Sequence, residues 1–182
     1  PSRLVQGPYL YYPAATWPHK AHAALFRAYA ALRARGAIAE RLVLTGQRTP
    51  FWERSLRPLA RELGIEREVV HLGFVPSDEV RRLYAGAAAV VFPTTFEGFG
   101  LPVLEAVQAG RKVVTSRLAV FDEIGVPRAA QADFDRPDEV LAALAQPGQP
   151  HRGDAMTSPS LVQDRLTAGL LFAGAAVGLV GQ

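Results

Sequence analysis

Short apolar runs alternate along this chain with longer stretches whose apolar positions recur at helical spacing. The apolar runs predict strands, and the amphipathic stretches predict helices. The predicted strands are residues 9–12, 41–45, 69–72, 88–92 and 112–115. The predicted helices are residues 19–35, 52–63, 77–84, 102–108 and 137–145, with a helical turn at 120–124. Ser77 is the expected N-cap of the third helix, because a serine hydroxyl can accept a free backbone N–H.

The predicted strands are apolar throughout rather than alternating, as in the run Ala88-Ala89-Val90-Val91-Phe92. Strands covered on both faces have this pattern. Alternation of such strands with helices predicts an α/β fold, a parallel sheet with helices on both faces. In such sheets ligands bind at the carboxyl ends of the strands, so function is expected in the loops that follow them.

The character of the chain changes after residue 146, which predicts a body at 1–146 and a linker with an apolar tail at 147–182. Residues 166–180 carry no charge. As a helix they would span about 22 Å, which is short of a ~30 Å hydrocarbon core. We expect a tail that packs on the body or is poorly ordered, with a membrane segment as the alternative.

Composition narrows the range of functions. With 182 residues, 49% of them apolar, the chain can bury one compact core, and its net charge is only +3. Basic runs with interleaved aromatic residues are absent, so nucleic-acid binding is not expected. The lack of cysteine excludes disulfides and thiolate metal sites and fits a reducing compartment. A chain that starts at Pro1 without a signal-peptide pattern is expected to be a cytoplasmic fragment, with the inner face of the membrane as an alternative location.

The segment from Thr94 to Ala109 combines features of a phosphate site. Gly98 and Gly100 allow the backbone to approach a ligand closely, and Pro102 suits a first helical turn. Free N–H groups at such a helix start favour an anion. Glu97 and Glu105 flank the site, and carboxylates accept hydrogen bonds from hydroxyls. A nucleotide sugar has both phosphates and hydroxyls; the alternative is an ordinary loop glutamate and a solvated helical glutamate.

The run from Glu97 to Glu105, a Glu-x7-Glu with Gly-Phe-Gly-Leu-Pro inside, resembles the family-4 (group 1) retaining glycosyltransferases. The flanking segments 90–94, 109–110 and 113–116 agree, and the resemblance covers roughly residues 9–145. It implies one half of a GT-B enzyme, the Rossmann-like C-terminal domain that binds the donor. The N-terminal acceptor-binding domain would then be absent from this chain. The reaction implied is transfer of a sugar from a nucleoside-diphosphate sugar to an acceptor with retention, without a metal or other cofactor.

The resemblance also implies residue roles. Glu97 would contact sugar hydroxyls, Lys20 the diphosphate and Glu105 the ribose, and Glu97 and Lys20 are the expected catalytic pair. The remaining donor contacts implied are the backbone of Gly98, Phe99, Gly100 and Leu101, the turn Thr45-Gly46, and Phe74 and Val75 beside the base.

Some features of the chain support other functions. Many members carry an arginine shortly before the lysine, and residues 12–16 contain none. This absence supports one alternative, a binding module that has lost its acceptor half. A GT-B epimerase or phosphorylase is a second alternative, against which the Glu-x7-Glu argues. Asp133-Phe134-Asp135 resembles a metal-binding Asp-x-Asp, but we expect Asp135 to cap the helix at 137–145. His19 and His22 have helical spacing for a metal but no third ligand nearby.

Overall fold

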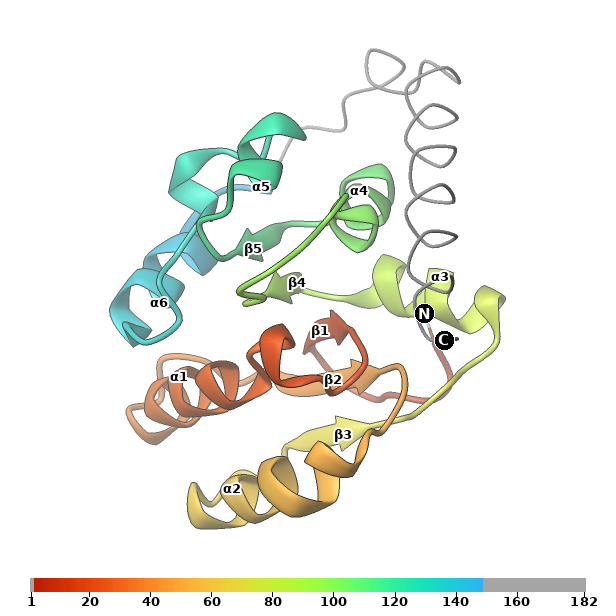
Figure 1. Cartoon of the computed structure of the whole chain (residues 1–182), viewed down its shortest axis with the longest axis vertical. Helices are drawn as coiled ribbons and strands as arrows, with labels where there is room; N and C mark the ends of the chain where they lie inside the picture. The colour runs from red at the N-terminus through yellow and green to blue at the C-terminus, as the bar shows by residue number, and fades with distance from the viewer. Residues whose placement is uncertain (1, 149–182) are drawn as a thin grey trace, which may run out of the picture. The chain divides into compact units, whose positions relative to one another are not determined.

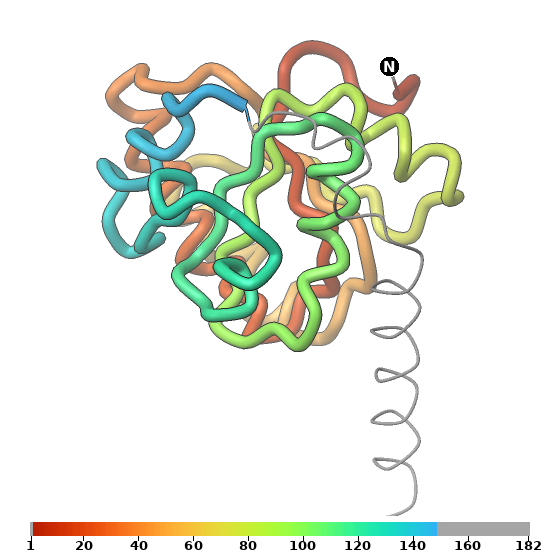
Figure 2. Tube along the Cα trace, turned by 90° about the horizontal axis from the view of Figure 1, so that it is seen from above, coloured from red at the N-terminus to blue at the C-terminus, as the bar shows by residue number. Residues whose placement is uncertain are grey.

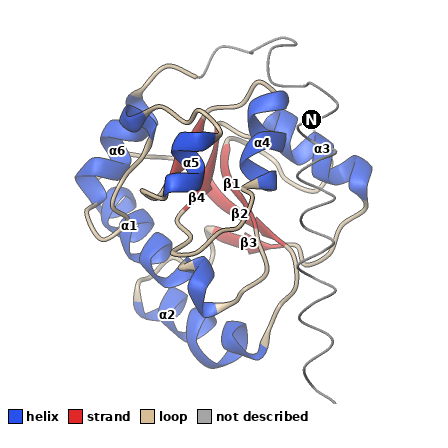
Figure 3. Ribbon diagram, turned by 45° about the horizontal axis from the view of Figure 1, so that its top comes forward, coloured by secondary structure: helices blue, strands red, loops and turns tan. Residues whose placement is uncertain are grey.

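The computed structural model describes residues 2–148, which contain a five-stranded sheet whose paired strands are all parallel. Its strands are β1 (Tyr9–Pro13), β2 (Arg41–Thr45), β3 (Val69–His71), β4 (Ala89–Phe92) and β5 (Val113–Thr115), in the order β3-β2-β1-β4-β5 (Figure 3). The central strand β1 pairs Leu10 with Leu42 on one side and with Ala89 on the other. The α/β class predicted from the apolar strands is confirmed.

Helices cover both faces of this sheet. On one face α1 (His22–Ala34) packs against α2 (Arg57–Glu62) and α6 (Pro137–Ala145) (Figure 1). On the other face α3 (Ser77–Gly86) contacts β1, and α4 (Leu101–Gln108) contacts β4 and β5. A π-helical stretch (Trp52–Leu56) precedes α2, and α5 (Ala119–Glu123) follows β5. Short 3-10 turns lie at Pro18–Lys20 and Arg128–Ala130.

The core lies between the sheet and its two helix layers. Tyr11, Tyr12 and Phe92 are fully buried there, together with Phe26 and Tyr29 of α1. The tyrosine hydroxyls in this core have hydrogen-bond acceptors; Tyr12 donates to the Lys20 carbonyl and Tyr29 to the Glu40 carbonyl, both at 2.7 Å. Buried polar groups need such partners, so these hydroxyls tie the sheet to the loops around it.

The first helix differs from its prediction. Residues 19–35 were expected to form one helix, but residues 18–20 form a 3-10 turn, closed by the Ala21 N–H on the Pro18 carbonyl at 3.0 Å. Ala21 then takes a left-handed conformation, with φ of 52°, before α1 begins. Lys20 therefore stands on a loop ahead of the helix, from which its side chain can face the strand ends.

Both capping predictions were wrong. Ser77 lies inside α3, whose N-cap is Pro76, and no side-chain hydrogen bond caps that helix. Asp135 does not cap α6, whose N-cap is Arg136; its backbone N–H donates instead to Asp133 Oδ1 at 2.9 Å. Pro76 occupies the N-cap position one residue before Ser77, and Arg136 occupies it one residue after Asp135, so each expected side chain is one residue out of register.

The predicted linker and apolar tail lie outside the described residues, except for Pro147 and Gly148. Within residues 2–148, no helix has the length and apolar character needed to cross a membrane.

Candidate functional site

The strand order creates a crevice at the carboxyl ends of β1 and β4. The chain proceeds from β1 to β2 and β3 on one side, and β4 and β5 lie on the other, so the connections after β1 and β4 leave in opposite directions. Ligands of parallel α/β sheets bind at such a switch point. The two loops are joined directly, because the Thr95 N–H and the Thr94 hydroxyl both donate to the His19 carbonyl, at 2.9 and 3.1 Å. Figure 2 shows the two segments, red and green, meeting at one edge of the domain.

Lys20 and Glu97 meet across this crevice. Lys20 Nζ lies 2.8 Å from Glu97 Oε2, and the two side chains are only 19% and 14% exposed. The Tyr12 hydroxyl holds the Lys20 carbonyl, and the Lys20 ammonium lies 5.8 Å from the centre of the Phe92 ring. A cation over an aromatic face is favourable, and the ring also limits its hydration. The two residues predicted to be catalytic are thus each other's ionic partner.

Next to this pair, the start of α4 presents unsatisfied backbone donors. Gly100 is the N-cap, with a φ of 65° that favours glycine, and no side chain caps the helix. A Cβ on Gly100 would lie 3.1 Å from Ile124 Cδ1, so packing also selects glycine here. Among the residues described, the backbone N–H groups of Gly98, Phe99, Gly100 and Leu101 donate to no protein acceptor. Free donors together with the positive end of the helix dipole favour an anion at this position.

Glu105 lies one turn further along α4 and faces a different partner. Its Oε2 accepts a hydrogen bond of 2.9 Å from the hydroxyl of Tyr84 on α3. The groove between α3 and α4 has a volume of about 520 Å³. Its lining includes Ser77, Val80, Arg81, Tyr84, Glu105 and Gln108. A nucleoside-sized group could therefore lie along α4 with Glu105 at its edge.

The other residues predicted to contact the donor differ in their exposure. Thr45 is 4% exposed, and its hydroxyl is paired with that of Tyr11 at 2.7 Å, so its side chain belongs to the core. Gly46 follows it and donates its N–H to the Gly73 carbonyl at 2.8 Å, which joins the loops after β2 and β3. Phe74 on the second of these loops is 81% exposed, and Val75 is partly buried. Of this set, Phe74 is the side chain most open to a ligand.

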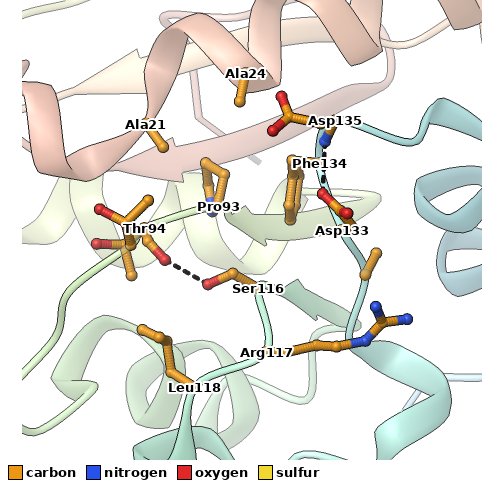
Figure 4. A pocket seen from close by; sticks show the side chains of 12 residues that line it. Ala21, Ala24, Pro93, Thr94, Ser116, Arg117, Leu118, Asp133, Phe134 and Asp135 are labelled. Carbon is orange, nitrogen blue, oxygen red and sulfur yellow. Dashed lines mark hydrogen bonds between the residues drawn. The ribbon is translucent and has the colours of Figure 1, made fainter.

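A second cavity of about 380 Å³ lies beyond the β4 loop, between α1 and the segment after β5. In Figure 4, Pro93 and Phe134 lie beside each other in its wall, and Arg117 extends away from them. Asp133 and Asp135, the pair that resembles a metal-binding motif, line this cavity. Asp133 Oδ1 is held by the Asp135 N–H, and residues 2–148 contain no cluster of three or more potential metal ligands.

The two histidines near Lys20 have opposite environments. His19 is exposed, whereas His22 is fully buried against Tyr12, with ring centres 4.6 Å apart. Burial lowers the pKa of His22 to about 3, so the ring is neutral in the folded protein. His22 thus serves as a core residue in this arrangement.

Sequence reasoning missed Tyr84 and Tyr12. Both lie at positions whose apolar periodicity predicts burial, and burial alone does not show where a hydroxyl points. The hydroxyls reach Glu105 and the Lys20 carbonyl only because α3 and the 18–20 turn pack beside them. No pattern in the linear sequence carried that information.

Comparison with known proteins identifies the family of this chain. The family model described as glycosyl transferases group 1 matches residues 7–146. The O-antigen chain mannosyltransferase B of Escherichia coli is 34% identical over 130 residues, 71% of this chain and 34% of that protein. The chain thus spans about a third of the length of this relative.

Solved structures agree on the fold. The C-terminal domain of a group 1 glycosyl transferase, LpcC from Francisella tularensis, aligns with a TM-score of 0.59 and 23% identity, over 70% of this chain and 67% of that one. HepE from Anabaena, solved with UDP and glucose, aligns with a TM-score of 0.59 and 19% identity, over 94% of this chain and 49% of that one. Since the family model covers residues 7–146, the chain belongs to the group 1 glycosyl transferases, and its fold is the Rossmann-like domain of the GT-B architecture.

Proposed function

We propose that this chain is the donor-binding domain of a retaining glycosyltransferase and takes a nucleoside-diphosphate sugar. The observation that carries the proposal is the row of N–H groups from Gly98 to Leu101, which donate to no acceptor within residues 2–148 and directly follow Glu97, the ionic partner of Lys20. Backbone donors at a helix start and a half-buried cation suit a diphosphate, which carries several charged oxygens. The structure of HepE with UDP and glucose supports a ligand of this class in the same fold.

The rest of the donor would extend from the diphosphate in two directions. The sugar would lie over Glu97, whose carboxylate can accept bonds from its hydroxyls. The nucleoside would enter the groove between α3 and α4, with Glu105 on the ribose. Phe74 offers an exposed ring to the base at the neighbouring loop. In this arrangement, different groups of the chain would bind the sugar, the diphosphate and the nucleoside.

Lys20 and the start of α4 would also assist the chemistry. In the proposed transfer the bond from the anomeric carbon to the diphosphate oxygen breaks. The acceptor oxygen bonds to that carbon from the same face, and its proton passes to the leaving diphosphate. Negative charge grows on the diphosphate as the bond breaks, and preorganised donors aimed at that charge lower the barrier. The acceptor would be held by a second domain, so we expect the chain alone to bind the donor without transferring sugar.

The name of the E. coli relative makes nucleoside-diphosphate mannose the first donor to test, and polysaccharide biosynthesis the expected context. The lack of cysteine fits a location in a reducing compartment such as the cytoplasm.

One observation favours a second candidate, a module that binds nucleotide sugars without catalysis. The loop from Ala14 to Thr16 supplies no cation, and Thr16 is buried, with its N–H bonded to the Gln47 carbonyl at 3.0 Å. Lys20 would then hold the diphosphate without a second basic side chain from this loop. A binding module has no leaving group to stabilise, so it can dispense with a second cation that a transferase would use for this purpose.

Calorimetry on the full chain tests the proposal. The titrants are GDP, UDP, GDP-mannose and UDP-glucose, and the variants are Lys20→Ala and Glu97→Ala. Lys112→Ala is the matched control, since Lys112 stands at the opposite end of the sheet and donates to the Leu144 carbonyl at 2.7 Å. Lys20→Ala should weaken diphosphate binding by roughly 10–100-fold, the equivalent of one charge-assisted hydrogen bond. Failure of every nucleotide to bind the unaltered chain would reject the proposal.

A further inference from the structure

The hydroxyl of Tyr84 stands between two acceptors on α4. It lies 2.9 Å from Glu105 Oε2 and 3.1 Å from the Pro102 carbonyl oxygen, and the side chain is 3% exposed. A tyrosine hydroxyl has one proton, so both acceptors compete for a single donor. Burial and the neighbouring Glu105 carboxylate raise the pKa of Tyr84, which keeps that proton on the hydroxyl.

The sheet fixes the position of this hydroxyl. The Tyr84 ring meets the Tyr11 ring edge to face, with centres 5.1 Å apart and planes at 81°. Tyr11, in the middle of β1, is in turn held by Thr45 at the end of β2, since their hydroxyls lie 2.7 Å apart. Edge-to-face aromatic pairs are stabilising beyond the area that they bury, which favours this one position of the Tyr84 ring. The donor that reaches Glu105 is therefore anchored in the core and does not move with the surface.

Glu105 itself lies on the exposed side of α4 and borders the groove between α3 and α4. Without a partner, an exposed glutamate samples several rotamers, and ordering it on binding costs entropy. Oε2 is held by Tyr84, and within residues 2–148 no donor binds the second carboxylate oxygen, Oε1, at the groove.

We infer that Tyr84 is a positioning residue that aims the Glu105 carboxylate at the ribose hydroxyls of the donor. The inference rests on the proposed function, because that function gives Glu105 its ligand. It adds a residue in the wall of the groove whose hydroxyl acts through Glu105. The removal of its hydroxyl should weaken recognition of the ribose and leave recognition of the diphosphate unchanged.

The test compares nucleotides with and without ribose hydroxyls on the full chain. Calorimetry gives the affinity ratio of UDP to 2′,3′-dideoxy-UDP, with the corresponding pair of guanosine nucleotides in parallel. Glu105→Ala should bring the ratio close to one. Tyr84→Phe should lower the ratio by about 3–10-fold, through loss of one hydrogen bond that orients a charged group, with dideoxy-nucleotide binding unchanged.

Tyr29→Phe is the matched control. Tyr29 is 1% exposed and donates to the Glu40 carbonyl at 2.7 Å on the other face of the sheet. Both variants lose one buried hydroxyl and should lower Tm by a similar amount, about 3 °C. Only Tyr84→Phe should change the affinity ratio. Tyr11→Phe, which leaves the Tyr84 hydroxyl in place, should preserve most of the ratio and serves as a second check on the core.

The outcomes separate the two claims. If the unaltered chain distinguishes the two nucleotides and Tyr84→Phe distinguishes them equally well, the positioning role is overturned while the proposed function stands. An equal loss of both affinities in Tyr84→Phe also overturns it, since that result indicates a general structural effect. A chain that binds neither nucleotide overturns the proposed function and this inference with it.

Discussion

The Lys20–Glu97 pair offers the sharpest test of the site. Glu97→Gln keeps the shape of the side chain but removes its charge, and Lys20→Met removes the ammonium and keeps most of the apolar stem. The two side chains are 19% and 14% exposed, with Nζ and Oε2 2.8 Å apart. Exposed pairs contribute under about 1 kcal/mol, whereas breaking a fully buried pair costs about 3–5 kcal/mol. Between these limits, we expect each single variant to lower the free energy of unfolding by about 2 kcal/mol.

Urea unfolding of the unaltered chain, both single variants and the double variant measures the coupling between the two side chains. Their proximity predicts a coupling free energy of about 1.5 kcal/mol. In a domain of this size, each single variant should lower Tm by roughly 4–8 °C. A coupling below about 0.5 kcal/mol would show that the pair is an incidental surface contact and would remove the basis for the prediction.

The two single variants should have opposite effects on nucleotide binding, since loss of the Lys20 ammonium weakens it. The Lys20 ammonium, which a diphosphate would use, donates a hydrogen bond to the carboxylate of Glu97. Glu97→Gln should therefore strengthen binding of UDP or GDP several-fold, because each 1.4 kcal/mol of released competition corresponds to a factor of ten. It should also reduce the additional affinity gained from the attached sugar. Weaker binding of the sugar-free nucleotide by Glu97→Gln would refute this account of the pair.

Two further predictions concern stability. Gly46→Ala should lower the free energy of unfolding by about 3 kcal/mol or more, since φ is 115° and a Cβ would lie 2.8 Å from the Ala14 carbonyl carbon. Gly98→Ala, whose Cβ would meet no atom within 4 Å, is the matched control and should unfold nearly as the parent does in urea. Burial lowers the pKa of His22 to about 3 and that of His71 to about 4, below the unfolded value near 6.5. The unfolded state therefore binds more protons than the folded state below pH 6.5. Between pH 7 and 5.5 the two histidines should together lower the free energy of unfolding by about 2.5 kcal/mol. Chemical denaturation at each pH should show that His22→Leu halves this loss.

Much of the fold follows from local patterns. The all-apolar run at 88–92 requires cover on both faces, and the intervening amphipathic stretches supply it, so a parallel sheet between helix layers is predictable. The donors at the start of α4 are also local, because Gly98, Gly100 and Pro102 set that backbone within a few residues. Periodicity could not reveal the left-handed Ala21, since its φ is set by the turn that joins the β1 loop to α1.

By itself, the sequence determined the class of fold, the candidate phosphate-binding loop and the two glutamates that flank it. Only the tertiary structure decided which groups these residues face. Lys20 and Glu97 are 77 positions apart and meet because β1 and β4 are neighbours in the sheet. Tyr84 and Glu105 meet because α3 and α4 pack on the same face. Periodicity records whether a side chain is buried, but its partner is chosen by strand order and helix packing, which join distant parts of the chain.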